Sequence, residues 1–600
     1  MAKSKLVQLI TGYEDNIGTA VGSQIGRKFY AKKISGSVTA NTKRFLSSKL
    51  MKFFKMLADL FAYAPAKTYG ALFMTFGLLS LIINFATDYF GSSGQMSLAS
   101  LVVGAAFAVV SVPFLLVDTP VSVMLQGFKP TEVIFFEFFC IKRLFYTGTE
   151  KGFNPLFGAF AGALLAILGA FISPEWVAIG MGILLFVAVS FNSPEFTFFS
   201  TLLLLPYVSL LPYSSVILAS AATLGVISFM RKTLFGKRVV FFEQYDALLT
   251  ILVIGILISG IFVKGIESFV GALLTVSAVC GYFMASNTVT NRRLADCAIN
   301  AVVISSLPAS AISFVKFIGN ALSGSPLDFL EHGISSTFSE ADSAAAFFLV
   351  ATIFSYILVK QSQGALRGAY AALMLLDVTA LIMTGQFMSI IALVLACGAY
   401  KSIKSGKWML LIMPLLLVLP YFLLFIPADF INFLPIKIIS ADTLNIFSAS
   451  LSAFGNNFLF GIGMGSDSFV KEMQNYGIDS ATDCGNIFLE LALEAGIFAS
   501  TAFLLLLLAR LVHRASYQRY IRQSQVSKLS PFMSMTVFAL LVFGGFDHVF
   551  CDTTVFYLFW CVFGIGSGAL RVAKAEHDDR VLYFEDEKSS ESAVANFYIR

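Results

Sequence analysis

Long apolar segments alternate with short polar turns along most of the chain. Each segment is about as long as the α-helix that crosses a hydrocarbon core of about 30 Å. Backbone N–H and C=O groups find no partner in lipid, so a spanning segment must satisfy them within a helix. The pattern therefore predicts an all-α, polytopic integral membrane protein with about 14–16 transmembrane helices. The expected spans are 69–89, 98–118, 153–173, 176–192, 196–211, 215–230, 246–264, 267–285, 297–316, 343–360, 366–384, 386–402, 408–427, 487–510, 532–548 and 553–571.

The composition supports the same class of protein. Hydrophobic residues make up 57% of the chain and charged residues only 13%, whereas a water-soluble domain carries about 25% charged residues. The 63 phenylalanines are typical of a surface that faces lipid. These values exclude a water-soluble enzyme.

Lysine and arginine gather in every second turn between the expected spans. Because cytoplasmic loops carry the excess of cations, we assign these turns and both termini to the cytoplasmic side of the plasma (inner) membrane. Two long segments, 317–342 and 428–485, then lie on the external side, and the second is a large loop before the last three spans. The cationic turns contain Lys142, Arg143, Arg231, Lys232, Lys237, Arg238, Arg292, Arg293, Lys360, Arg367, Lys401, Lys404, Lys407, Arg510, Arg514, Arg519 and Arg522.

The two ends of the chain differ in charge. Residues 1–67 contain twelve Lys or Arg and three acidic residues, a net charge of +9 against +5 for the whole chain. Residues 39–63 place lysines between apolar positions at helical spacing, which is typical of a helix on an anionic membrane surface or of a solvated helix packed on cytoplasmic loops. We expect a basic cytoplasmic amphipathic segment (1–67), an N-terminal transmembrane bundle (68–340), a transmembrane region that includes the external loop 428–485 (341–572) and an acidic cytoplasmic tail (573–600).

Three motifs between residues 340 and 570 resemble those of the O-antigen ligase and O-antigen polymerase superfamily of membrane glycosyltransferases. The turn Leu381–Phe387, with Thr384 and Gly385, is similar to the superfamily's Thr-Gly-Ser-Arg turn. The run from Ala453 to Phe469, which contains Gly463 and Gly465, resembles its glycine-rich loop. The helix that starts at Asn486 resembles the superfamily's His-Asn helix start, and Glu494 matches a common acidic position.

The resemblance implies transfer of a glycan from a lipid diphosphate carrier to an acceptor hydroxyl. That scheme uses arginines for the diphosphate and a histidine for the acceptor, and it needs neither metal nor cofactor. The expected partners are a lipid-linked glycan, membrane lipids and polysaccharide assembly proteins, and no nucleic acid. This chain departs from the pattern, because Gln386–Phe387 replaces Ser-Arg and Gly485 replaces the histidine. The loop 428–485 contains neither arginine nor histidine.

Other residues are candidates for the missing roles. Lys437 and Lys471 are the only cations of the loop 428–485, and either one binds a phosphate as a point charge or is an ordinary solvated lysine. His548 is a candidate general base whose tautomer Asp547 would set, or else a histidine wetted at a helix end. The motif residues Thr384, Gly385, Gly463, Gly465 and Asn486 complete the expected substrate site, although a glycine-rich turn also allows tight re-entry of the chain into the membrane.

Two alternative functions remain open. A member that has lost catalysis would act as a scaffold in polysaccharide assembly, with the basic segment and the acidic tail as docking surfaces. A transporter or flippase would depend on Asp377 and Lys316, because ionisable residues within spans are either functional or neutralised inside the protein. Cys484 and Cys551 lie at predicted external helix starts and form either a disulfide or two free thiols.

Overall fold

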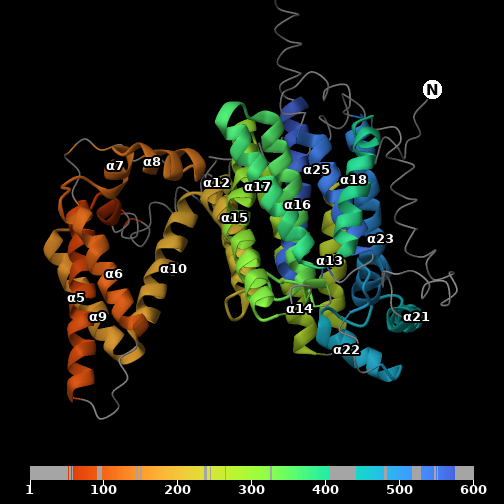
Figure 1. The fold of residues 1–600 in the computed structure, drawn as a ribbon, viewed down its shortest axis with the longest axis horizontal. Coiled ribbons are helices and arrows are strands. Elements are labelled where there is room, and N and C mark those ends of the chain that lie inside the picture. Colours follow the sequence, from red (N-terminus) through yellow and green to blue (C-terminus); the bar gives the residue numbers. More distant parts are fainter. Residues whose placement is uncertain are drawn as a thin grey trace, which may run out of the picture. The chain divides into compact units, whose positions relative to one another are not determined.

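The structure is a computed structural model, and its regular elements confirm the predicted all-α class. In the part of the chain that it describes, every regular element is helical, and the only strand-like feature is an isolated bridge between Pro65 and Pro120 (Figure 1). The described residues are 52, 56, 59–90, 98–141, 143, 146, 148, 152–234, 240–243, 245–263, 265–324, 328–330, 332–405, 441–478, 483–516, 529–545, 549–550 and 552–574.

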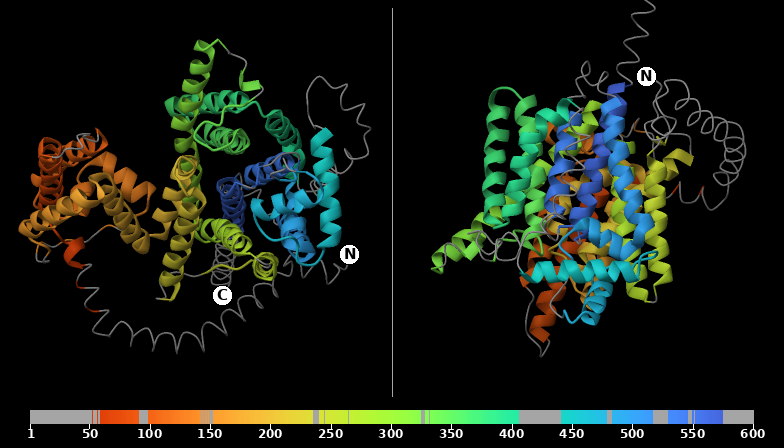
Figure 2. Two further views of the ribbon diagram at one scale, coloured as in Figure 1. Left: turned by 90° about the horizontal axis from the view of Figure 1, so that it is seen from below. Right: turned by 90° about the vertical axis from the view of Figure 1, so that its right-hand side faces the viewer.

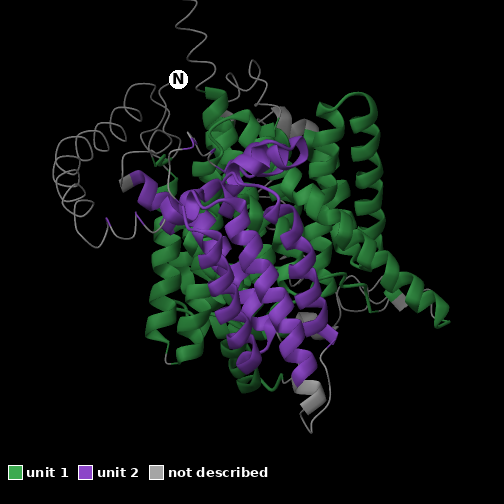
Figure 3. Ribbon diagram, turned by 90° about the vertical axis from the view of Figure 1, so that its left-hand side faces the viewer, with its two compact units in different colours: residues 1–29, 198–226, 239–600 green, residues 30–197, 227–238 purple. Residues whose placement is uncertain are grey.

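The chain divides into two compact units, coloured separately in Figure 3. Unit 2 comprises residues 30–197 and 227–238, and unit 1 comprises residues 1–29, 198–226 and 239–600. Helices α11 and α12 each have residues in both units. The helices that begin in unit 2 are α5 (Ala66–Phe90), α6 (Leu98–Leu115), α7 (Val121–Gln126), α8 (Lys129–Thr131), the π-helix η2 (Glu132–Phe138), α9 (Pro155–Ile172), α10 (Pro174–Asn192) and α11 (Pro194–Val208).

Unit 1 contains the regions that carry the motifs. Its helices are α12 (Ser214–Leu234), α13 (Asp246–Phe262), α14 (Ile266–Thr288), α15 (Arg292–Leu322), the 3-10 turn η3 (Asp328–Leu330), α16 (Ala341–Gln361), α17 (Gly364–Met383), α18 (Phe387–Ser405), α21 (Ala441–Asn456), α22 (Ser466–Asn475), α23 (Ile487–Ser516), α25 (Leu529–Gly544) and a final helix, Thr553–Lys574.

The helices agree with the expected spans. Eleven described helices are long and apolar enough to cross a membrane, and three shorter apolar helices (Asp246–Phe262, Phe387–Tyr400 and Leu529–Gly544) coincide with further expected spans. The expected span 196–211 is the 15-residue helix α11, which contains Pro206. The expected span 408–427 lies outside the described residues. The chain is therefore a multi-pass membrane protein.

Small residues let the helices of unit 2 approach closely. Helix α5 packs against α6 and α9, and a Cβ atom added at Gly158 of α9 would lie 2.0 Å from the carbonyl oxygen of Thr68. One turn later, a Cβ at Gly162 would lie 2.0 Å from Thr75 Oγ1, and the Thr75 hydroxyl donates to Ala159 O at 3.1 Å. Lipid provides no hydrophobic drive between helices, so this close backbone contact is what favours their association.

In unit 1, the final helix lies at the centre and is buried along almost its whole length. Trp560 of this helix is fully buried among aromatic rings. Around it, α13 packs against α14 and α23, α16 against α17, and α18 against α25. Helices α21 and α22 lie at the end of the bundle where α13 ends and where α14 and α23 begin (Figure 1, bottom). We call this the loop end, and the opposite end, with Arg510 and Arg571, the arginine end.

Most of the basic segment and of the acidic tail lies outside the described residues. The predicted division into regions 1–67, 68–340, 341–572 and 573–600 follows charge and motifs rather than packing, and it stays a prediction. The orientation of the termini stays a prediction as well.

Candidate functional site

Helix α23, which begins directly after the motif residue Asn486, is interrupted at Gly496. Gly496 has a φ of 76°, so the helix breaks one residue after Ala495 and then resumes. The break frees two carbonyl groups from the helical pattern. The carbonyl of Leu493 accepts from Ile462 N at 2.8 Å, and that of Glu494 accepts from Gly463 N at 3.2 Å. The carbonyl groups that the break leaves without helical partners therefore accept hydrogen bonds from the glycine-rich loop.

The loop approaches the break so closely that side chains would not fit. A Cβ atom at Gly461 would lie 2.3 Å from Glu494 O, and one at Gly496 would lie 2.2 Å from Leu459 O. Both glycines also have positive φ, which strains other residues. Residues 457–465, Asn486 and residues 493–497 together form what we call the glycine-loop unit. In Figure 2, the cyan segment before α22 lies against blue α23.

Side chains from three helices hold the loop in place. Glu494 Oε1 accepts from Gly465 N at 3.0 Å, and Ser268 Oγ of α14 accepts from Met464 N at 3.1 Å. Ser259 of α13 donates to Glu494 O at 2.6 Å. Gly463 and Gly465 were predicted to bind substrate. Their N–H groups, which a phosphate cradle would use, already donate to Glu494.

Asn486 joins the start of α23 to the end of α25. Its Oδ1 accepts from Phe488 N at 2.9 Å and from Leu489 N at 3.1 Å, which caps the helix. Its Nδ2 donates to Gly545 O at 2.8 Å. Asn486 is buried, so each of these bonds replaces water. His548, the predicted base, and its partner Asp547 follow Gly545 by three and two residues, and both lie outside the described residues.

Of the two candidate lysines, Lys471 belongs to the described residues and Lys437 does not. Lys471 lies on α22 with an exposed side chain, and its ammonium donates to Glu267 Oε2 at 2.6 Å. The hydrogen bond and the charge of Glu267 raise the pKa of Lys471, which stays cationic at neutral pH. The carboxylate neutralises this cation, so a phosphate would have to compete with Glu267. Lys437 lies outside the described residues.

The turn with Thr384 and Gly385 contacts a different part of unit 1. Thr384 is buried and donates to Leu381 O at 2.6 Å. A Cβ at Gly385 would lie 2.2 Å from Phe329 O, so the turn packs closely on the segment before α16. The contacts of this turn are with residues 329–334, whereas those of the glycine-loop unit are with α13, α14, α23 and Gly545.

Cys484 is buried at the start of the α23 region. Burial raises the pKa of its thiol well above the usual range, and Sγ lies 3.2 Å from Asn486 O. Cys551, its predicted partner, lies outside the described residues. The proposed disulfide therefore stays a prediction.

Asp377 and Lys316, the basis of the transporter alternative, have different partners. Lys316 donates to Ser336 O at 2.6 Å and stands 3.4 Å from Ser335 Oγ. Asp377 is fully buried and accepts from serine hydroxyls of α15 and α16. Lys316 thus holds a loop, and its ammonium is not the counter-charge of Asp377.

The arginine end contains a polar cluster that the sequence analysis did not identify. Tyr282 donates to Asp246 Oδ1 at 2.5 Å, and Tyr245 donates to Ser567 Oγ at 2.8 Å. Arg510 donates to Tyr245 Oη at 3.3 Å, and Arg571 donates to the carbonyl of Ser286. In the sequence, Arg510 contributes only to the assignment of the topology. The partners come from α13, α14, α23 and the final helix, so only the folded chain brings them together.

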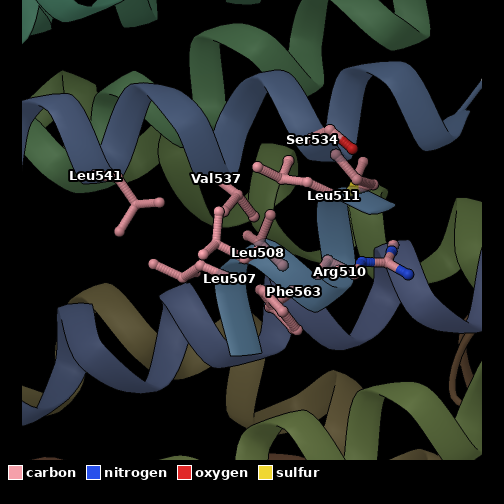
Figure 4. A pocket seen from close by; sticks show the side chains of 11 residues that line it. Leu507, Leu508, Arg510, Leu511, Ser534, Val537, Leu541 and Phe563 are labelled. Atoms are coloured by element: carbon pink, nitrogen blue, oxygen red, sulfur yellow. The ribbon is translucent and has the colours of Figure 1, made fainter. Parts of the chain in front are cut away.

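A cavity of about 30 Å³ lies beside Arg510, between α23, α25 and the final helix (Figure 4). Its lining is apolar apart from Arg510 and Ser534. This volume holds one or two water molecules and excludes a glycan. The lining residues are Leu507, Leu508, Arg510, Leu511, Met533, Ser534, Val537, Leu541, Val562, Phe563 and Gly566.

Among the described residues, no group of three or more His, Cys, Asp or Glu side chains is placed to hold a metal ion. No protein-family model matches the chain, and no curated protein matches it. A functional assignment therefore depends on the residues and their geometry.

Proposed function

We propose that the chain acts at the outer face of the plasma membrane in surface polysaccharide assembly, as an O-antigen ligase-like protein that handles a lipid-diphosphate-linked glycan. The observation that carries the proposal is the hydrogen bond from Asn486 Nδ2 to Gly545 O. It joins the motif-bearing start of α23 to the chain three residues before His548. The strongest motif is therefore joined to the segment of the chain that leads into the candidate base.

Within this function we assign the glycine-loop unit a positioning role. The N–H groups of Gly463 and Gly465 donate to Glu494 of α23, and that of Met464 donates to Ser268 of α14. Ser259 of α13 donates to Glu494 O, and Asn486 donates to Gly545 O. We assign the chemistry to residues outside this unit. His548, oriented by Asp547, takes the proton of the acceptor hydroxyl, and Lys437 steadies the departing diphosphate.

Transfer of the glycan breaks its bond to the diphosphate and forms a bond to the acceptor oxygen, whose proton goes to His548. The released lipid diphosphate carries more negative charge than the lipid-linked glycan, so a cation such as Lys437 beside it lowers the barrier.

The test is a surface-glycan profile of a strain that lacks the gene, together with the lipid-linked glycans in its membranes. Deletion should abolish a surface polymer and cause its lipid-linked precursor to accumulate, and the wild-type gene should restore both. The double variant Lys437→Ala/His548→Ala should restore neither, although its membrane level equals that of wild type. Full restoration by this variant would contradict transferase chemistry and favour a scaffold. An unchanged glycan profile after deletion would contradict the function itself.

A further inference from the structure

The most unusual ionisable group of unit 1 is the carboxyl group of Asp377. It belongs to α17, and its side chain is 0% exposed. Ser310 Oγ of α15 donates to Oδ1 at 3.2 Å, and Ser355 Oγ of α16 donates to Oδ2 at 2.9 Å. Ser306 of α15 also lies close to the carboxyl group. We call these four residues the Asp377 site.

A carboxylate at this position needs a compensating positive charge. Moving an ion from water into a medium of low dielectric costs much free energy, even after the surroundings relax. Hydroxyl groups recover only part of that cost. Among the described residues, no cationic side chain forms an ion pair with Asp377.

Three cations on the packed helices α15 and α16 have partners of their own. On α15, Lys316 is bound to Ser336 O, and Arg292 pairs with Asp296 at 3.6 Å. On α16, Lys360 lies over the ring of Tyr356. Among the described residues, none supplies a cation to Asp377, so a bound cation or a proton would balance its charge.

The oxygen atoms of the site match a small, hard cation. The Ser306 hydroxyl donates its only hydrogen to Val303 O at 2.9 Å, so its lone pairs are available to a cation. The two carboxylate oxygens and three hydroxyl oxygens come from three helices. We propose that Asp377, Ser306, Ser310 and Ser355 form a binding site for one sodium ion within the membrane region. This inference goes beyond the proposed function and does not depend on it.

The single negative charge of the Asp377 site favours a monovalent ion. One carboxylate neutralises one positive charge, whereas a divalent ion would leave a net charge buried in low dielectric. Oxygen ligands are the kind that hard cations prefer. Thr352 lies one turn before Ser355 on α16, is buried, and has an Oγ1 without a hydrogen-bond partner in the described structure. It provides a further oxygen on the same helix face.

Polar groups continue from the site toward the Met383 end of α17. About 9 Å of helix separates Asp377 from that end. On α15, Ser313 follows Ser310 at helical spacing, and Ser336 donates to Ala309 O at 2.6 Å. Buried hydroxyl groups therefore lie on this side of the site as well.

The test measures binding of radioactive sodium to the purified full-length chain in detergent, together with the thermal unfolding midpoint in sodium or choline chloride. The wild-type chain should bind one sodium ion saturably, and sodium should raise its midpoint. Asp377→Asn, which keeps the shape and removes the charge, should weaken sodium binding at least tenfold and abolish the shift. Asp296→Asn is the matched control, since Asp296 is a carboxylate of α15 that pairs with Arg292, and it should bind sodium like wild type.

The serine variants keep the proposal testable if Asp377→Asn does not fold. Ser310→Ala and Ser355→Ala each remove one hydroxyl and should each weaken sodium binding about tenfold, which corresponds to about 1.4 kcal/mol. Absence of saturable sodium binding to the folded wild-type chain would overturn the proposal. So would unchanged binding in the serine variants, or displacement of sodium by calcium at equal concentration.

Discussion

The glycine-loop unit and the Asp377 site are both buried and polar, but they satisfy their polar groups in different ways. In the glycine-loop unit, backbone groups of the loop pair with the backbone of a broken helix, and Asn486 and Glu494 complete the pairing. In the Asp377 site, a single carboxylate depends on hydroxyl groups from two other helices. The first arrangement defines a shape, and the second leaves a charge that an ion can balance. The motif residues of the glycine-loop unit therefore maintain its backbone conformation, whereas the charge of Asp377 is available to a ligand.

The largest expected effect concerns the shape of the glycine-loop unit. In Gly461→Ala, the new Cβ would meet Glu494 O at 2.3 Å, so the loop must leave the break in α23. Gly477→Ala is the matched control, because Gly477 has nearly the same φ of 75° and no atom within 4 Å of the added Cβ. We expect the control to lose about 1–2 kcal/mol of unfolding free energy. Gly461→Ala should lose considerably more in thermal unfolding, and equal losses would contradict the close packing.

The next effect separates the two roles of Asn486. Asn486→Ala should cost about 1 kcal/mol for the lost cap and a further 1–3, roughly, for the unpaired carbonyl of Gly545. Asn486→Ser keeps a capping oxygen but has no amide group to donate to Gly545 O. The unfolding midpoint of Asn486→Ser should therefore fall between those of wild type and Asn486→Ala. A midpoint equal to that of wild type would show that the bond to Gly545 contributes nothing.

A smaller effect tests the Asp377 site against the glycine-loop unit. Ser355→Ala removes one hydroxyl from the carboxylate, which should cost about 1.5–3 kcal/mol. If sodium occupies the site, the loss should be larger in sodium chloride than in choline chloride, because the variant also forfeits ion binding. The loss in Gly461→Ala should be the same in both salts. If the loss of stability in Ser355→Ala is the same in both salts, sodium does not occupy the Asp377 site.

The smallest effect concerns Lys471. Its side chain is exposed and its partner is Glu267 on the same surface, and exposed ion pairs contribute little to stability. Lys471→Ala should leave the unfolding midpoint unchanged within error and should restore surface polymer in the deletion strain. Loss of polymer with a normal amount of folded protein would instead give Lys471 a role in substrate binding.

The sequence predicted the helical membrane fold because hydropathy and the needs of the backbone in lipid act locally. It also located the start of α23 at Asn486 and the polar loop before it. It did not predict the break at Gly496, because a glycine inside an apolar helix permits a break without requiring one. The contacts of Gly461 and Gly463 with Glu494 depend on the docking of distant segments. The same holds for the cluster around Arg510 and Tyr245, whose partners are hundreds of residues apart.

Asp377 illustrates the opposite situation. Its position within an apolar span was evident in the sequence, and an ionisable group there suggested function. The sequence grouped it with Lys316 because both are ionisable groups, one within a predicted span and the other close to the end of another. The structure provides serine hydroxyls as partners instead. Serines of this kind carry no motif, so only the packing of α15, α16 and α17 could identify them.

The central claim is that the motif residues position a site whose chemistry lies at His548 and Lys437. The measurement that tests it most directly is the amount of surface polymer per membrane-inserted protein, compared between His548→Ala and Lys471→Ala in the deletion strain. The account predicts that His548→Ala makes no polymer although its protein level is normal, and that Lys471→Ala makes as much as wild type. Normal polymer from His548→Ala, with none from Lys471→Ala, would contradict it.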